Sequence, residues 1–120
     1  MGRGCALLVV AVLCFLSHFE GACGATYVVG DRRGWTFNVA NWPDRKIFRA
    51  GDVLIFRYNP SFHNVVAVNP ADYRSCAAPR ASSTLTSGND RVTLKRGLNS
   101  FICTYAGHCQ AGMKIQVSAT

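Results

Sequence analysis

Short apolar or alternating segments, separated by turn residues, make up most of the chain after residue 24. Six of them have the length and the β-branched and aromatic content of strands: Thr26–Val29, Val53–Tyr58, Asn64–Val68, Arg91–Leu94, Ser100–Thr104 and Lys114–Val117. Turn-forming residues lie between them, for example at Asn59–Pro60 and Ser87–Asn89. Several short strands at this spacing predict an all-β sandwich or barrel.

Helical structure is expected only in short segments. The stretches Val39–Trp42 and Ala71–Ser75 predict single helical turns, because Pro43 and Pro79 prevent longer helices. The glycine pair in Gly30–Gly34 predicts a turn rather than a phosphate-binding loop, since the wider glycine pattern of a nucleotide site is missing.

The first 24 residues have the three parts of a secretory signal. Arg3 gives the positive start, Leu7–Leu16 is the apolar run, and Ala22–Gly24 offers small residues for cleavage. A transmembrane anchor is the less favoured interpretation, because this run is shorter than the roughly 20 residues that span a bilayer. We therefore expect a signal peptide at 1–24 and one secreted, extracellular domain at 25–120.

The chain is strongly basic. Thirteen lysines and arginines against six acidic residues give a net charge of +7, and the leader carries one of each sign. Such a surface favours acidic partners through electrostatic steering. The basic residues are scattered from Arg32 to Arg96, so we do not expect a nucleic-acid interface.

The most informative motif lies near the end of the chain, where Cys103, His108 and Met113 are five residues apart. Gly107 and Gly112 stand between these residues and can adopt the positive φ angles of a tightly folded loop. The motif therefore predicts one loop whose three side chains turn toward a common point.

A fourth ligand is expected from His63. It is the only other histidine once the leader, which contains His18, is removed. One thiolate, two imidazoles and a weak axial thioether form the ligand set of a blue-copper electron-transfer site. We predict one type 1 copper ion bound by His63, Cys103, His108 and Met113.

Other interpretations of these residues are possible. A lone methionine often fills core space, and a lone histidine often only makes hydrogen bonds. Zinc bound by His63, Cys103, His108 and Cys109 is the nearest rival. However, adjacent residues on extended backbone point to opposite sides, so His108 and Cys109 are poorly placed to face one ion.

The same geometry predicts the disulfide. If His108 faces the metal, Cys109 faces away and can pair with Cys76, the only other cysteine of 25–120 besides Cys103. Such a bridge stabilises the folded chain by about 3–4 kcal/mol in the chain-entropy model. Cys103 then stays a free thiol that can bind copper.

Nine stretches of the domain match a known family: Tyr27–Gly30, Gly34–Phe37, Trp42–Pro43, Phe48–Asp52, Tyr58–Ser61, His63–Val66, Thr86–Gly88, Phe101–Cys103 and Gly107–Ile115. Through them the chain resembles the phytocyanins, the plant cupredoxins, and within these the plantacyanin group, also called basic blue proteins or chemocyanins. The resemblance implies a cupredoxin-like Greek-key β-sandwich or barrel with short helical segments. It also implies the copper ligands and the disulfide given above.

Further expectations follow from the resemblance. An imidazole edge of His108 should reach the surface as the electron port, and the backbone of Asn64 should tie the His63 strand to the Cys103 loop. Met113 places the chain with the Met-type centres, since stellacyanins carry glutamine there. We expect a monomer without a membrane anchor, whose partner is an unidentified redox protein or an anionic cell-wall component.

Three classes of function remain. The ligand set favours an extracellular electron shuttle. The resemblance leaves open a signalling or binding module of plant reproduction, of the kind that guides pollen tubes, in which redox activity is secondary. An enzyme is not expected, because a copper oxidase needs further histidines and a hydrolase needs Cys103 and His108 free of metal.

Overall fold

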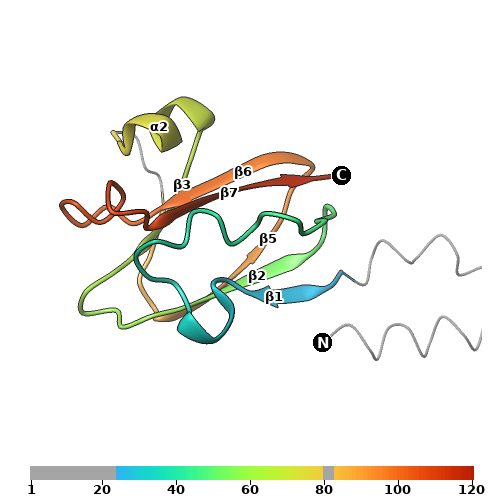
Figure 1. Cartoon of the computed structure of the whole chain (residues 1–120), viewed down its shortest axis with the longest axis horizontal. Coiled ribbons are helices and arrows are strands. Elements are labelled where there is room, and N and C mark those ends of the chain that lie inside the picture. Colours follow the sequence, from blue (N-terminus) through green and yellow to red (C-terminus); the bar gives the residue numbers. More distant parts are fainter. Residues whose placement is uncertain (1–23, 80–82) are drawn as a thin grey trace, which may run out of the picture.

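The computed structural model describes residues 24–79 and 83–120, which form two β-sheets with short helices between the strands (Figure 1). The strands are β1 (Thr26–Val28), β2 (Val53–Arg57), β3 (Val65–Val68), β4 (Thr84–Leu85), β5 (Asn89–Thr93), β6 (Gly97–Ile102) and β7 (Lys114–Ala119). The helices are the 3-10 helix η2 (Asp31–Arg33) and the α-helix α2 (Pro70–Ser75). One sheet has the order β1-β2-β5, and the other β4-β3-β6-β7. This arrangement confirms the predicted all-β class.

The main core lies between the two sheets. Leu54 and Phe56 of β2 face it from one side, and Phe101 of β6 and Ile115 of β7 face it from the other. All four side chains are almost fully buried. Burial of such a side chain stabilises the folded state by about 1.5–3 kcal/mol, so this core is what holds the sheets together.

Alternation along β3 and β6 gives the second sheet two apolar faces. Val65, Phe101 and Cys103 lie in the main core, whereas Val66 and Ile102 face the opposite side. Helix α2 packs against that opposite side, and this contact covers the outer face of the sheet (Figure 1). The two-residue period of a strand therefore directs the thiol of Cys103 inward.

Helix α2 begins and ends at defined caps. The side chain of Asn69 accepts a hydrogen bond from the amide of Asp72 at 2.8 Å, and Pro70 occupies the first helical turn. Cys76 ends the helix in a left-handed conformation with φ of 54°. The caps explain why the predicted helical turn at Ala71–Ser75 is present.

Some predicted elements differ from the structure. Val39–Trp42 is a hydrogen-bonded turn, closed by the Trp42 amide and the Val39 carbonyl at 2.9 Å, and not a helix. Strand β4 is not predicted from the sequence, and β6 begins at Gly97, three residues before the predicted strand Ser100–Thr104. Gly97 extends the strand because it pairs with Ala119 of β7.

Two loops meet at the end of the sandwich that lies opposite the C-terminus, on the left in Figure 1. Residues 58–64 connect β2 to β3, and residues 103–113 connect β6 to β7. The predicted leader lies outside the described residues except for Gly24, so its cleavage stays a prediction. Within 24–79 and 83–120, no helix is long and apolar enough to cross a membrane.

Candidate metal centre

The loop between β6 and β7 folds back on itself through backbone hydrogen bonds. The amide of Cys103 donates to the carbonyl of Met113, and the amide of Met113 donates to the carbonyl of His108, both at 3.1 Å. Gly112 has φ of +86°, and a Cβ atom there would lie 2.9 Å from the Cα of Asn38. The close approach and the positive φ explain why this position requires glycine.

His63 comes from the loop between β2 and β3, whose backbone is held by Asn59. The Asn59 carbonyl accepts hydrogen bonds from the amides of Phe62 at 3.0 Å and His63 at 3.1 Å. The Asn59 side chain accepts a third from the amide of Ser61 at 2.9 Å. Asparagine commonly forms such turns with the backbone two residues on. This turn fixes the position of His63 just before β3.

The three strongest predicted ligands converge. Nδ1 of His63 lies 3.1 Å from Nδ1 of His108, and the Cys103 sulfur lies 3.5 Å from the same His108 nitrogen. One ligand atom from each residue lies within 4.8 Å of the other two. Cys103 is fully buried and unbridged, while both histidines are half-buried. The site therefore has a buried thiol and two imidazoles that reach toward the surface.

Met113 stands at the end of the loop that carries Cys103 and His108. Its side chain is fully buried and belongs to the same core cluster as Cys103. Its backbone is hydrogen-bonded to both Cys103 and His108. The thioether as an axial ligand stays a prediction, consistent with this position.

The donor atoms suit copper. A thiolate and two imidazoles in one cluster are the in-plane ligands of a blue-copper site, and soft sulfur favours copper over hard cations. The rival zinc set would need the thiol of Cys109, but that sulfur is bonded to Cys76. The cluster of His63, Cys103 and His108 is therefore a candidate copper site.

His63 is favoured in the form that binds a metal. Burial, and after it the nearby His108, lowers the pKa of His63 below its ordinary value. A lower pKa favours the neutral ring, and only a neutral imidazole has a lone pair for a metal. Nδ1 of His63 lies at the point where the two imidazoles meet.

Asn64 links the two loops, but not in the way predicted. Its side chain, rather than its backbone, makes the link: Nδ2 donates to the Thr104 hydroxyl at 2.7 Å, and the Thr104 amide donates to Oδ1 at 2.9 Å. The Asn64 carbonyl instead accepts a bond from the indole of Trp35 at 2.8 Å. The difference from the prediction has a geometric reason, because only the side chain of Asn64 reaches across to the Cys103 loop.

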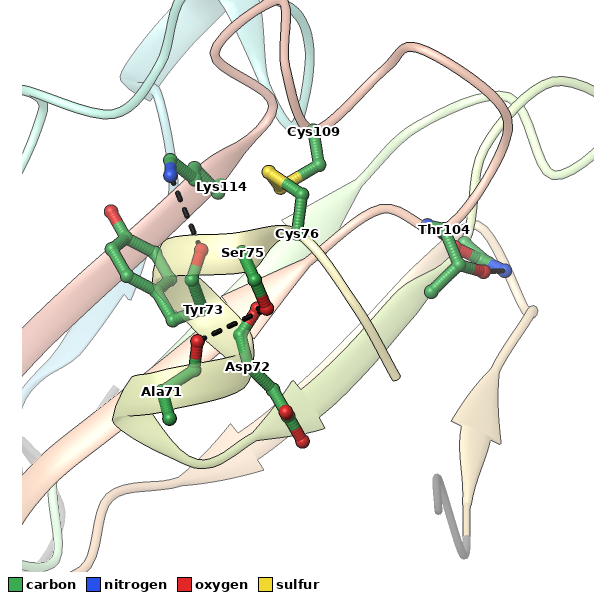
Figure 2. Close-up of a disulfide and its surroundings, with 9 residues drawn as sticks. Ala71, Asp72, Tyr73, Ser75, Cys76, Thr104, Cys109 and Lys114 are labelled. Carbon is green, nitrogen blue, oxygen red and sulfur yellow. Dashed lines mark hydrogen bonds between the residues drawn. A yellow bond between two sulfur atoms is a disulfide. The ribbon is translucent and has the colours of Figure 1, made fainter. Parts of the chain in front are cut away.

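The predicted disulfide is present between Cys76 and Cys109 (Figure 2), with the sulfurs 2.06 Å apart. It joins the end of α2 to the residue that follows His108. Lys114 reinforces this contact, since its ammonium donates to the Tyr73 carbonyl at 3.2 Å and lies 4.4 Å from the centre of the Tyr73 ring. Helix α2 thus anchors the metal loop to the sheet.

Sequence reasoning missed the aromatic residues around the histidines. Phe37 packs edge-on against His108 and His63, with ring centres 4.8 and 5.5 Å apart. Tyr105 stacks on His108 at 5.7 Å, with the ring planes 23° apart. The signal available was the position of Phe62 and Tyr105 within three residues of a ligand, but nothing local points to Phe37.

A β-sandwich with a buried free thiol and two imidazoles converging between its end loops defines a cupredoxin-type copper protein. Residues 35–113 match the family model for the plastocyanin-like domain. The chain belongs to this family of blue copper proteins, in its phytocyanin branch.

Individual relatives agree with this assignment. The chain is 53% identical to chemocyanin of Lilium longiflorum over 115 residues, which cover 95% of this chain and 91% of the relative. The solved structure of cucumber basic protein, a blue copper protein, superimposes with a TM-score of 0.78 at 53% identity, covering 80% of this chain and all of the cucumber chain. Spinach plantacyanin gives a TM-score of 0.70 at 50% identity, with coverage of 80% and 100%.

Proposed function

We propose that this protein is a secreted type 1 copper protein that transfers single electrons by cycling between Cu(II) and Cu(I). The convergence of the Cys103 sulfur with Nδ1 of His63 and His108 carries the proposal. Met113 completes the set as the axial ligand. Bound copper would supply a one-electron couple at this point, and the protein would supply its geometry.

The chain's own contacts keep that geometry constant. Asn64 and Thr104 lock the two loops together, while the disulfide holds the residue next to His108. Ligands that cannot move reduce the rearrangement that accompanies a change of oxidation state. The half-buried rings of His63 and His108 give a partner access to the site, so both imidazoles, and not His108 alone, are candidate electron ports.

Electron transfer fits these residues better than catalysis. A copper oxidase needs additional histidine ligands, and the chain has only His18 besides the two at the site. A cysteine hydrolase needs an accessible thiolate, whereas Cys103 is fully buried. We therefore assign no catalytic residue.

The partner is expected to be acidic. Arg57 pairs with Asn89 across β2 and β5, so Arg57 and Arg91 project from the same outer face of that sheet. Arg33 adds a third cation, with its guanidinium 3.0 Å from the Phe37 carbonyl beside the site. Secretion to the extracellular matrix would bring these arginines to an acidic redox protein or an anionic cell-wall component.

The proposal is tested by voltammetry of the copper-loaded protein. We expect a reversible one-electron wave that Cys103→Ser abolishes while circular dichroism stays native, because the disulfide and core remain. A wave unchanged in that variant would exclude the proposed centre.

The axial ligand has its own test. Met113→Gln should keep copper bound but lower the reduction potential, because an oxygen donor favours Cu(II) over Cu(I). An unchanged potential would remove Met113 from the ligand set.

A binding or signalling module remains the second candidate, supported by the similarity to a protein named chemocyanin. The folded Cys103→Ser variant separates the two functions. Biological activity that survives in this variant, for instance an effect on growing plant cells, would favour the module. Activity lost together with electron exchange would favour the shuttle.

A further inference from the structure

An apolar hollow of about 320 Å³ lies directly over the two histidines. It is lined by Phe37, Ser61, Phe62, His63, Tyr105 and His108. Phe62 is 60% exposed, Tyr105 41% and Phe37 39%. Within the described residues, three of the five large hydrophobic side chains that are exposed therefore gather at this one place. Such a concentration of exposed apolar surface is typical of a binding site.

The side chains form a floor and walls. The floor consists of the imidazoles of His63 and His108, which are half-buried. Phe37 stands edge-on to both rings, and Tyr105 lies nearly parallel to His108. Phe62 stands beside His63 with ring centres 6.5 Å apart. A planar ligand in this hollow would contact the faces and edges of the aromatic rings and, at the same time, the edge of an imidazole.

We propose that this hollow binds a small single-ring aromatic reductant of the dihydroxybenzene class, which donates electrons to the site. The inference rests on the proposed electron-transfer function. The volume is at the lower end of the range for small-molecule clefts, which suits one ring with its substituents. Aromatic walls favour a flat π system, and Ser61 offers a hydroxyl at the rim for a phenolic oxygen.

The charge around the hollow further limits the class of reductant that it can bind. Among the described residues, the titratable side chains that line the hollow are the two histidines and Tyr105. The guanidinium of Arg33 lies 3.0 Å from the Phe37 carbonyl. The chain as a whole carries a net charge of +7. The positive charge of the protein repels a cationic reductant, whereas it does not repel a neutral phenol.

In the proposed redox step the oxidised protein is the oxidant, and no further oxidant is needed. One dihydroxybenzene molecule would give up one electron and release one hydroxyl proton to water, and it would leave as a neutral aryloxyl radical. Copper held by His63, Cys103 and His108 would supply the one-electron acceptor, passing from Cu(II) to Cu(I). Two such radicals then disproportionate to one quinone and one dihydroxybenzene.

Stopped-flow reduction of the Cu(II) protein by 1,4-dihydroxybenzene tests the site, with hexacyanoferrate(II) as a reductant that has no ring. We expect a hyperbolic dependence on dihydroxybenzene concentration. In Phe62→Ser, the ratio of the dihydroxybenzene rate to the hexacyanoferrate rate should fall about five- to tenfold, since an aromatic contact is lost. Leu98→Ser is the matched control, because Leu98 is 56% exposed but does not line this hollow. Its ratio should equal that of the wild type.

Binding is measured without turnover by titrating phenol into the reduced, Cu(I) protein and recording proton NMR spectra. Saturable shifts confined to Phe37, Phe62, Tyr105 and the two histidines support the site. A linear dependence of the rate on dihydroxybenzene, an unchanged ratio in Phe62→Ser and an absence of such shifts would together overturn it. If hexacyanoferrate(II) still reduces the protein in that case, only the aromatic site fails. If neither reductant does, the proposed function fails as well.

Discussion

The two loops that meet at the candidate copper site are built differently. The loop at 103–113 carries three predicted ligands and is fixed mainly by its own backbone hydrogen bonds and glycines, with one covalent tie to α2 through the disulfide. The loop at 58–64 carries only His63. Asn59 shapes its turn, and contacts with other parts of the chain hold its two ends. Its anchors are Tyr58, whose hydroxyl bonds to Asp90, and Asn64, which bonds to Thr104.

This difference shows that one loop is shaped by residues close in the sequence, whereas the other depends on contacts with distant residues. A ligand loop that holds itself can be recognised from spacing alone, because the residues that shape it are its own. A loop that is held by distant residues cannot be recognised from spacing alone. Substitutions of the residues that shape the first loop without binding metal should therefore cost mainly stability, and substitutions that break contacts between the loops should cost copper affinity as well.

The largest loss of stability is expected when the disulfide is removed. Cys76→Ala together with Cys109→Ala opens a bridge that spans 33 residues, which lowers the free energy of unfolding by about 3–4 kcal/mol. Chemical denaturation measures the loss. A change below about 1 kcal/mol would mean that hydrogen bonds and packing, rather than the bridge, fix the 103–113 loop.

Two glycines of the same loop form a matched pair. Both have positive φ, but a Cβ at Gly112 meets the backbone of Asn38, whereas a Cβ at Gly107 has open space. Gly112→Ala should lower the free energy of unfolding by about 3 kcal/mol, and Gly107→Ala by about 1 kcal/mol. Equal losses, again by chemical denaturation, would show that the contact with Asn38 does not matter.

The link between the loops is tested by Asn64→Ala. Loss of its two hydrogen bonds to Thr104 should cost about 2 kcal/mol of stability and reduce copper affinity about 10- to 100-fold. Asn99→Ala is the control, since the hydrogen bonds recorded for the Asn99 side chain go to Lys95 and Gly97, which lie outside the two loops. Competition with a copper chelator should show weaker binding for Asn64→Ala alone. Equal affinities in the two variants would contradict the link.

The smallest effect is expected at the root of the His63 loop. Burial, and then the hydrogen bond to Asp90, raises the pKa of Tyr58 to about 12. Because an unfolded tyrosine titrates near 10, the stability gained from this group is complete below pH 10 and is lost between pH 10 and 12. Tyr58→Phe should cost about 1 kcal/mol at neutral pH, and the gap to the wild type should close across that window. A gap that stays constant from pH 8 to 12 in denaturation curves would refute this origin.

The sequence predicted the fold class and most strands because alternation is a local property, as in β6, where Phe101 and Ile102 face opposite sides. It predicted Cys103 and His108 from their spacing in one loop, and it predicted the disulfide because the adjacent residues His108 and Cys109 point apart. It did not predict that the Asn64 side chain bonds to Thr104, nor that Phe37 packs on both histidines. Those contacts depend on how distant segments meet. The same holds for β4, which pairs with β3 and whose Leu85 carbonyl accepts a hydrogen bond from the Tyr58 hydroxyl at 3.0 Å.

The visible absorption spectrum during addition of Cu(II) to the purified domain tests the central claim most directly. An intense thiolate-to-copper charge-transfer band should grow until one equivalent is bound, and it should be missing in Cys103→Ser. Copper that binds without this band, or a band that persists in Cys103→Ser, would contradict the assignment of His63, Cys103 and His108 as a blue-copper centre.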